Sequence, residues 1–282
     1  MLDPRLARLT ITLSTDEWVL PPADLALSND DVHVWRVWLD LAVSSVRHLR
    51  FTLAPDELRR ADRYHFETDR RRFIIARGVL RAILSRYLHQ APGQLQFGSN
   101  PYGKPTLLHP SAPDRLRFNV SHSDGLALIA IAAGREVGVD LERVRVDFAC
   151  ERIAEQFFSP REITALRALP AALRREALFT CWTRKEAYIK ARGEGLSLPL
   201  DRFDVSLAPD LPAALLDVEG DPHEASRWSL RALHPGAGYV AALAVEGRGW
   251  NLRRWQWATT AGVDVGWRPI PATDLREASI SL

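Results

Sequence analysis

Apolar residues recur along this chain with two different periods, and the two periods predict helices and strands within one fold. Between residues 69 and 89 they return every three or four positions, which predicts a long amphipathic helix. A second long helix is predicted over 171–191, where Gly193 ends it. Ser159 and Glu162 form a capping-box pattern with a proline between them, so a shorter helix is predicted to begin there.

Short runs of apolar and β-branched residues predict buried strands around these helices. The predicted strands cover residues 32–39, 117–121, 126–133, 136–142, 203–207, 228–233 and 239–245. The strands 126–133 and 136–142 are expected to pair as a hairpin across a turn at Gly134. Strand, long helix and strands thus occur twice, with paired arginines at 71–72 and 174–175 opening the long helices. The repeat fits a duplicated α+β unit and a coincidence equally well.

The overall charge is nearly balanced, but lysine is scarce. The chain has 37 basic and 35 acidic residues, and only three of the basic ones are lysine, namely Lys104, Lys185 and Lys190. Because arginine supplies the generic positive charge, each lysine is a candidate for a specific role. The hydrophobic share of 46% and the charged share of 26% are typical of a folded protein and exclude disordered and collagen-like classes.

Basic residues cluster between Arg59 and Arg86, where nine arginines accompany only three acidic residues. A solvated helix face would explain such a run, and so would a binding site for an anion. The pI of about 8.7 is lower than expected for a strongly basic nucleic-acid-binding domain, and no nucleic-acid-binding motif is present. No nucleic-acid partner is therefore expected, and a small phosphorylated ligand fits the cluster better.

The cysteines and the apolar runs predict the compartment. Cys150 and Cys181 are too few for a disulfide framework and lie outside any metal-binding cluster, so both are expected to be small buried side chains in a reducing compartment. The longest uninterrupted apolar run, 126–133, is far shorter than the roughly 20 residues of a membrane-spanning helix. The first residues show no signal-peptide pattern. We therefore expect a cytoplasmic protein without a membrane partner.

Three carboxylates on two predicted elements are the first candidates for chemistry. Asp140 and Glu142 are two positions apart, so both point to one face of a strand. In the second long helix, Trp182, Glu186 and Lys190 follow one another at intervals of four and share one stripe. An exposed strand edge and a surface Glu–Lys pair would explain the two patterns separately. Together they predict a site for Mg²⁺, with Mn²⁺ as the alternative, that phosphate groups of a substrate would complete.

Two further clusters offer donors for an anion. Asn119, Ser121, His122 and Ser123 leave a predicted strand together, although each has an ordinary role in a turn. Lys104 lies between two prolines, at 101 and 105, and their rigid turn restrains its side chain. No Walker loop and no kinase glycine loop is present, so a nucleotide would have to be held in another way.

These residues lie in five short segments: GKP at 103–105, FNVSHS at 118–123, GVDLE at 138–142, FFSPRE at 157–162 and W-x-x-K-E-A-x-x-K at 182–190. In order and spacing the segments resemble the 4'-phosphopantetheinyl transferase superfamily, in its long, surfactin-synthetase-type branch. The resemblance covers about residues 55–207. It implies an α+β fold with two similar subdomains related by a pseudo-twofold axis, divided here at 1–125 and 126–282, with the active site and coenzyme A between them.

The resemblance also implies a reaction. The 4'-phosphopantetheine group of coenzyme A would be moved to a serine of an apo acyl or peptidyl carrier protein, with Mg²⁺ as cofactor, and adenosine 3',5'-bisphosphate would be released. A catalytically inactive carrier-binding module is the alternative, and a magnesium nuclease is a third hypothesis. A monomer is expected, and the carrier would dock near residues 143–158.

Site residues are carried over by position within the five segments. Asp140, Glu142 and Glu186 match the metal ligands, and Glu186 also matches the base that activates the serine. Lys190 matches the residue that contacts the pyrophosphate and the leaving group, so Asp140, Glu186 and Lys190 are the implied catalytic set. Glu162 matches a family acid, although helix capping alone would explain it. The remaining implied coenzyme A contacts are Lys104, Lys185, Ser121, His122, Arg72 and Arg60.

Overall fold

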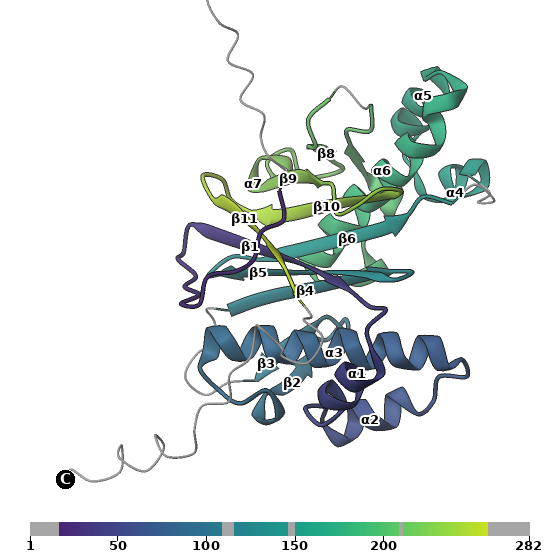
Figure 1. The fold of residues 1–282 in the computed structure, drawn as a ribbon. Helices are drawn as coiled ribbons and strands as arrows, with labels where there is room; N and C mark the ends of the chain where they lie inside the picture. Colours follow the sequence, from purple (N-terminus) through teal and green to yellow (C-terminus); the bar gives the residue numbers. More distant parts are fainter. Residues whose placement is uncertain (1–16, 109–115, 146–149, 209–210, 259–282) are drawn as a thin grey trace, which may run out of the picture.

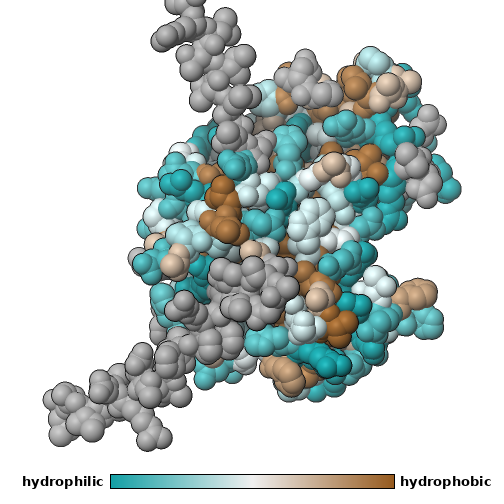
Figure 2. All heavy atoms as spheres, in the orientation of Figure 1, coloured by the Kyte–Doolittle hydropathy of each residue, from teal (hydrophilic) through white to brown (hydrophobic). Residues whose placement is uncertain are grey.

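Two β-sheets and two long helices form the centre of the protein, as the computed structural model in Figure 1 shows. The structure describes residues 17–108, 116–145, 150–208 and 211–258. The order of the layers is helix, sheet, sheet, helix, because each sheet has a long helix on its outer face and the other sheet on its inner face (Figure 1). Hydrophilic residues cover most of the face seen in Figure 2, and hydrophobic residues form separate patches on it.

The first sheet has the strand order β11-β1-β5-β4. β1 pairs in parallel with β11, while the other two pairings are antiparallel. The bounds are β1 Asp31–Trp38, β4 Leu116–Ser123, β5 Leu126–Ala133 and β11 Asn251–Gln256. The second sheet has the antiparallel order β6-β10-β9, with β6 Val137–Arg143, β9 Trp228–Leu233 and β10 Tyr239–Glu246. Two short ribbons pair β2 Gln96–Ser99 with β3 Pro105–Leu108 and β7 Phe203–Val205 with β8 Leu215–Val218.

Each half of the protein contains one 22-residue helix, α3 or α6, and several shorter helices. The α-helices are α1 Val43–Arg50, α2 Pro55–Ala61, α3 Glu67–Leu88, α4 Cys150–Phe157, α5 Pro160–Ala168, α6 Ala171–Arg192 and α7 Glu224–Arg227. Three short 3₁₀ helices are η1 Pro92–Gln94, η2 Gly195–Ser197 and η3 Leu200–Arg202. The α+β class and the two-subdomain organisation predicted from the sequence are confirmed.

Three apolar cores hold the layers together, and strand alternation explains how. In β5, Ile129 points to α3 and joins the first core, whereas its neighbour Leu128 points to the second sheet. Every residue of β5 is buried because both faces of this strand are covered. Between β6 and α6 the backbones approach so closely that a Cβ on Gly138 would lie 2.1 Å from the carbonyl oxygen of Ala187. Glycine at this position therefore allows the helix to pack directly on the strand.

The long helices were predicted to within two residues, and the capping box at α5 is confirmed. Ser159 Oγ accepts a hydrogen bond from the Glu162 amide at 3.1 Å, and the Glu162 carboxylate accepts one from the Ser159 amide at 3.0 Å. Cys181 is a buried free thiol as expected, whereas the side chain of Cys150 lies outside the described residues. Among the described residues, no helix has the length and apolar content needed to cross a membrane.

The predicted hairpin of strands 126–133 and 136–142 is wrong. β5 pairs with β1 and β4, whereas β6 pairs with β10 in the other sheet. The turn at Gly134 therefore joins two facing sheets and not two neighbouring strands. β5 belongs to the first sheet and β6 to the second, and β11 returns to the first sheet beside β1. Two consecutive apolar strands look the same in sequence whether they pair in one sheet or face each other across a core.

Candidate active site

The candidate site lies where β4, β6 and α6 meet, at the boundary of the two sheets. β4 and β6 are edge strands of different sheets, and polar side chains on β4 bind β6 across the gap. Ser121 Oγ donates to Asp140 Oδ1 at 2.9 Å, and Ser123 Oγ donates to a Glu142 carboxylate oxygen at 3.0 Å. Two residues before Ser121 in β4, Asn119 Oδ1 accepts a hydrogen bond from the backbone amide of Val139 at 2.9 Å. These cross-sheet hydrogen bonds fix both carboxylates in orientation.

Lys190 joins α6 to this pair of strands. Its ammonium group contacts Asp140 Oδ1 at 2.6 Å and Ser121 Oγ at 3.1 Å. The Asp140 side chain is only 3% exposed, and its second carboxylate oxygen, Oδ2, has no hydrogen-bond partner among the described residues. A buried carboxylate oxygen without a donor is costly, so this atom is available for a ligand that bears positive charge.

Mutual repulsion and burial change the acidity of the other two carboxylates. Burial, and then the charge of Asp140, raise the pKa of Glu142 above its ordinary value. The same two causes raise the pKa of Glu186, while Lys190 opposes the shift. Two carboxylates with raised pKa values, together with the free oxygen of the neighbouring Asp140, suit a hard divalent cation. Across the ranges that the structure describes, no three acidic, histidine or cysteine side chains already lie close enough together to hold a metal ion.

A cavity of about 300 Å³ lies beside these groups, and its size suits a small-molecule ligand. Its walls bring together three of the five sequence segments. They are formed by the turn at Tyr102–Pro105, by Asn119 and Val120 of β4, by Glu186, Ile189 and Lys190 of α6, and by Gly193 and Gly195. Residues more than 80 positions apart in sequence thus enclose one space, with a carboxylate and an ammonium group in its wall.

Lys104 lines this cavity, but its ammonium group is bound within the protein. It contacts Glu136 at 2.7 Å and the carbonyl oxygen of Ala191 at 2.9 Å, and burial lowers its pKa. The same Glu136 carboxylate also binds Arg117 at 2.8 Å. Asn100 donates to the Gly193 carbonyl at 2.6 Å nearby. The turn that carries Lys104 is therefore tied to the start of β6 and to the end of α6.

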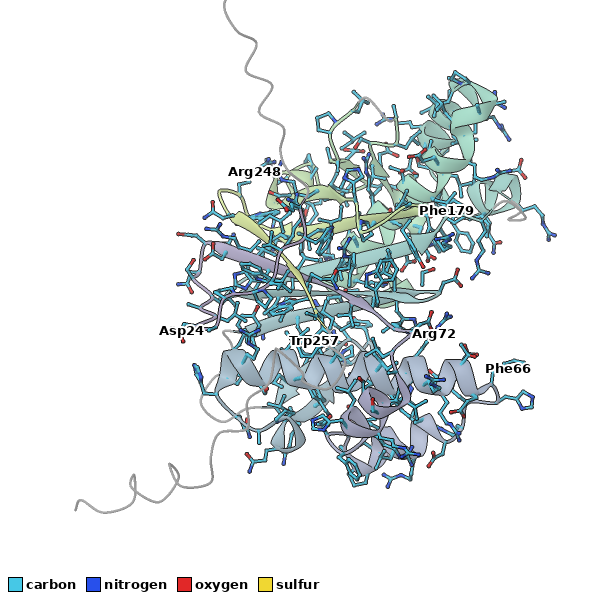
Figure 3. The ribbon with its side chains drawn as sticks, viewed as in Figure 1. Asp24, Phe66, Arg72, Phe179, Arg248 and Trp257 are labelled. Carbon is cyan, nitrogen blue, oxygen red and sulfur yellow. The ribbon has the colours of Figure 1, made fainter. Side chains whose placement is uncertain are left out.

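Three further predicted coenzyme A contacts, His122, Arg72 and Arg60, do not line this cavity. His122 is exposed at the end of β4, where desolvation by the surrounding protein and then the charges of Lys190 and Arg60 lower its pKa. Arg72 extends from α3 on the side that faces the strands (Figure 3). Its guanidinium binds Asp40 at 3.0 and 3.1 Å, which raises the pKa of Arg72. The Arg60 guanidinium lies 5.3 Å from the centre of a neighbouring aromatic ring.

Lys185 does not reach the site, which corrects its assignment as a coenzyme A contact. Successive helix residues point about 100° apart. Lys185 therefore faces the second core, which is the apolar core between α6 and the second sheet, while Glu186 faces the cavity. Its side chain is fully buried, binds Glu162 at 2.7 Å and donates to the Leu200 carbonyl at 2.7 Å. Glu162 also accepts the Val205 amide at 2.8 Å. This pair joins α5, α6 and β7, and it is structural.

Two residues of the site, Glu136 and Asp40, were missed in the sequence. Ser123 was among the predicted anion donors, but its hydrogen bond to Glu142 was not predicted. The period of two along a strand does place Ser123 on the same face as Ser121. Glu136 and Asp40 carry no such local signal, because each acts through a partner far away in sequence.

We expect the metal-free stability to depend on pH through Glu142. Its raised pKa means that the folded protein holds this proton more tightly than the unfolded chain does. The corresponding stability is fully present below the unfolded pKa of about 4.3 and is lost as the pH rises through the folded pKa. In EDTA, Glu142→Gln should therefore melt a few degrees above the parent protein at pH 8, and the difference should disappear near pH 4. Thermal unfolding from pH 4 to 8 measures this, and a difference independent of pH would contradict it.

Comparisons with known proteins agree with the resemblance that the five sequence segments carry. A model described as the 4'-phosphopantetheinyl transferase superfamily matches residues 136–244, and one described as 4'-phosphopantetheinyl transferase, N-terminal, matches residues 42–134. The chain is 42% identical over 240 residues to the 4'-phosphopantetheinyl transferase HetI of Nostoc sp., covering 85% of this chain and 98% of that protein. It is 31% identical over 179 residues to the 4'-phosphopantetheinyl transferase Sfp of Bacillus subtilis, covering 63% of this chain and 77% of that protein. The two model matches meet at the junction of β5 and β6.

Proposed function

Since the chain belongs to the 4'-phosphopantetheinyl transferase superfamily, we propose that it transfers the 4'-phosphopantetheine group of coenzyme A to a serine of an apo carrier protein. The serine oxygen forms a bond to the phosphorus of the phosphopantetheine phosphate, and the bond from that phosphorus to the pyrophosphate bridging oxygen breaks. The products are the holo carrier protein and adenosine 3',5'-bisphosphate. The observation that carries the proposal is the buried Asp140, bound by Lys190, beside Glu186 in the wall of the cavity.

Asp140, Glu142 and Glu186 would hold Mg²⁺, with Mn²⁺ as the alternative. The free oxygen of Asp140 and the raised pKa values of Glu142 and Glu186 support this set, since all three supply oxygen ligands and repel one another without a cation. When bound, the ion would neutralise negative charge on the pyrophosphate of coenzyme A. Ser121 and Ser123 hold two of the three carboxylates in place from the facing sheet.

Glu186 is the proposed base. A glutamate with a raised pKa is a stronger base than a free carboxylate, and a base is most effective when its pKa approaches the working pH. Glu186 would take the proton of the serine hydroxyl, directly or through a water molecule. Lys190, whose ammonium already lies beside Asp140, would stabilise the charge that develops on the departing phosphate.

The basic and polar residues around the cavity would bind coenzyme A. His122, Arg72 and Arg60 are proposed to contact its phosphorylated nucleoside. The charge of Arg60 helps to lower the pKa of His122, after burial and Lys190, which supports a shared anion site for these two residues. Lys104 and Ser121 line or adjoin the cavity but already have protein partners. We therefore assign them a positioning role as well as ligand contact.

The partner would be an apo acyl or peptidyl carrier protein, bound to a monomer of this chain in the cytoplasm. Its docking surface is proposed along residues 143–158, of which 146–149 lie outside the described residues. Arg143 and Arg145 precede this gap, and Arg145 binds Asp124 at 3.2 Å beside the site. A partner that inserts a serine into the cavity would approach this edge.

Incubation with coenzyme A, Mg²⁺ and a panel of apo carrier proteins tests the activity. We expect the mass of at least one carrier to rise by that of a phosphopantetheine group, and adenosine 3',5'-bisphosphate to form in equal amount. Binding of a carrier without any mass increase would support the inactive module and contradict the proposal.

Replacing Lys190 by Arg is expected to lower kcat by about a hundredfold, because a displacement of about 1 Å at a reacting centre can have this effect. The compact ammonium contacts Asp140 and Ser121 at once, and a planar guanidinium is too large to keep both contacts. Initial rates of holo carrier formation measure the effect. Arg192→Lys, on the last turn of the same helix, is the matched control. Near-normal turnover of Lys190→Arg would show that only positive charge is needed there.

A further inference from the structure

A second cavity, of about 380 Å³, lies between α1 and the first turns of α3. Its apolar part is formed by Val43, Val46 and Ile74, of which the last two are buried. Its polar part carries four guanidinium groups and only two carboxylates. These come from Arg47, Arg50, Arg70 and Arg71, and from Asp62 and Glu67. Positive charge is therefore in excess around a space large enough for a small organic molecule.

The arginines of this cavity are only partly neutralised. Arg50 lies 3.6 Å from Asp62 with both side chains about half exposed, a weak pair, and Arg70 binds Glu67. Arg71 donates to the carbonyl oxygen of Leu41 at 2.9 Å and has no carboxylate partner within the described ranges. Arg47 likewise shows no ion pair in the part of the chain that the structure covers. At least two guanidinium groups thus keep donors for a ligand.

This cavity is separate from the candidate active site. Arg70, Arg71 and Ile74 share one stripe of α3, whereas Arg72 points to the strands (Figure 3). α1 and α2 lie on the side of α3 that faces away from the strands (Figure 1). No residue lines both cavities.

We propose that the cavity between α1 and α3 binds a small, soluble organic phosphate that has a short apolar part. Guanidinium forks match the oxygens of a phosphate monoester in charge and geometry, and Arg47 and Arg71 are placed to bind it. The apolar floor at Val46 and Ile74 would contact the organic part. This inference does not depend on the transferase activity, and its test involves no turnover.

Phenyl phosphate is the probe, because it joins one phosphate to one small apolar group. It is titrated calorimetrically into the full chain that has been saturated with coenzyme A, so that the other phosphate-binding surface is occupied. We expect one binding site, weaker binding of inorganic phosphate, and no measurable binding of phenol. Arg47→Gln with Arg71→Gln should weaken phenyl phosphate binding by about tenfold or more, because each lost charge-assisted hydrogen bond can account for that factor.

Arg175→Gln, an exposed arginine on α6 in the other half of the protein, is the matched control and should bind the probe like the parent. Arg47→Gln alone is the second variant. Its side chain is exposed, so this change should leave the melting temperature unaltered and still weaken binding. Equal binding by parent and Arg47→Gln/Arg71→Gln proteins, equal binding of phenol and phenyl phosphate, or no binding to the parent would each overturn the proposal.

Discussion

Replacing Glu186 by Gln is expected to reduce phosphopantetheine transfer at least about a thousandfold while the protein stays folded. The substitution removes a proton acceptor, whose loss alone lowers rates by about 10²–10⁴-fold, and it also removes one proposed ligand of Mg²⁺. The side chain keeps its size and hydrogen-bonding capacity. Burial and Asp140 raise the pKa of Glu186, so a neutral amide relieves repulsion in the folded state. The expected result is a stable and inactive protein.

Single-turnover assays with coenzyme A and an apo carrier measure this loss, and thermal unfolding measures the fold. Glu176→Gln is the matched control, because Glu176 is exposed on the same helix and faces no part of the site. Mg²⁺ should raise the melting temperature of the parent and of Glu176→Gln, and raise that of Glu186→Gln much less. Turnover by Glu186→Gln within tenfold of the parent would exclude Glu186 as the base. An undiminished response to Mg²⁺ would exclude it as a ligand.

The shared faces of the proposed catalytic groups were predictable because these residues follow local periods. Asp140 and Glu142 are two apart on a strand, and Glu186 and Lys190 are four apart on a helix, so each pair had to share a face. The same argument could not orient Lys185. The sequence correctly placed Lys185 in a long helix. Strands elsewhere in the chain decide which side of that helix faces the cavity and which side faces the core. Pairing of Lys185 with Glu162 in the second core settled this.

The sheet topology shows the same limit at a larger scale. The helices were predictable from one continuous segment each, and α3 and α6 begin and end close to the predicted residues. The neighbours of a strand lie far away in sequence, and the parallel pairing of β1 with β11 joins residues more than 200 positions apart. Lys104 lines the cavity, but its partner Glu136 is brought to it only by the packing of the two halves.

Replacing Lys185 by Met is expected to destabilise the protein by about 3–5 kcal/mol, because it leaves the buried carboxylate of Glu162 without its cation. Burial already raises the pKa of Glu162, and without Lys185 the charged form becomes still less favourable. Two backbone amides, of Ser159 and Val205, remain as donors but carry no full charge. The urea midpoint should fall sharply, with an unchanged slope if unfolding stays two-state.

A second substitution separates lost stability from lost catalysis. Adding Glu162→Gln to Lys185→Met removes the uncompensated charge and should recover part of the stability, since a neutral side chain is much less costly to bury. If Lys185 is structural, folded Lys185→Met protein at low temperature should transfer phosphopantetheine at a rate within a few-fold of the parent. A Lys185→Met protein that is as stable as the parent but inactive would return this lysine to the active site. If transfer persists in the destabilised Lys185→Met protein, the two lysines of one helix differ by register alone, with Lys190 expected to control the rate of transfer and Lys185 the stability of the fold.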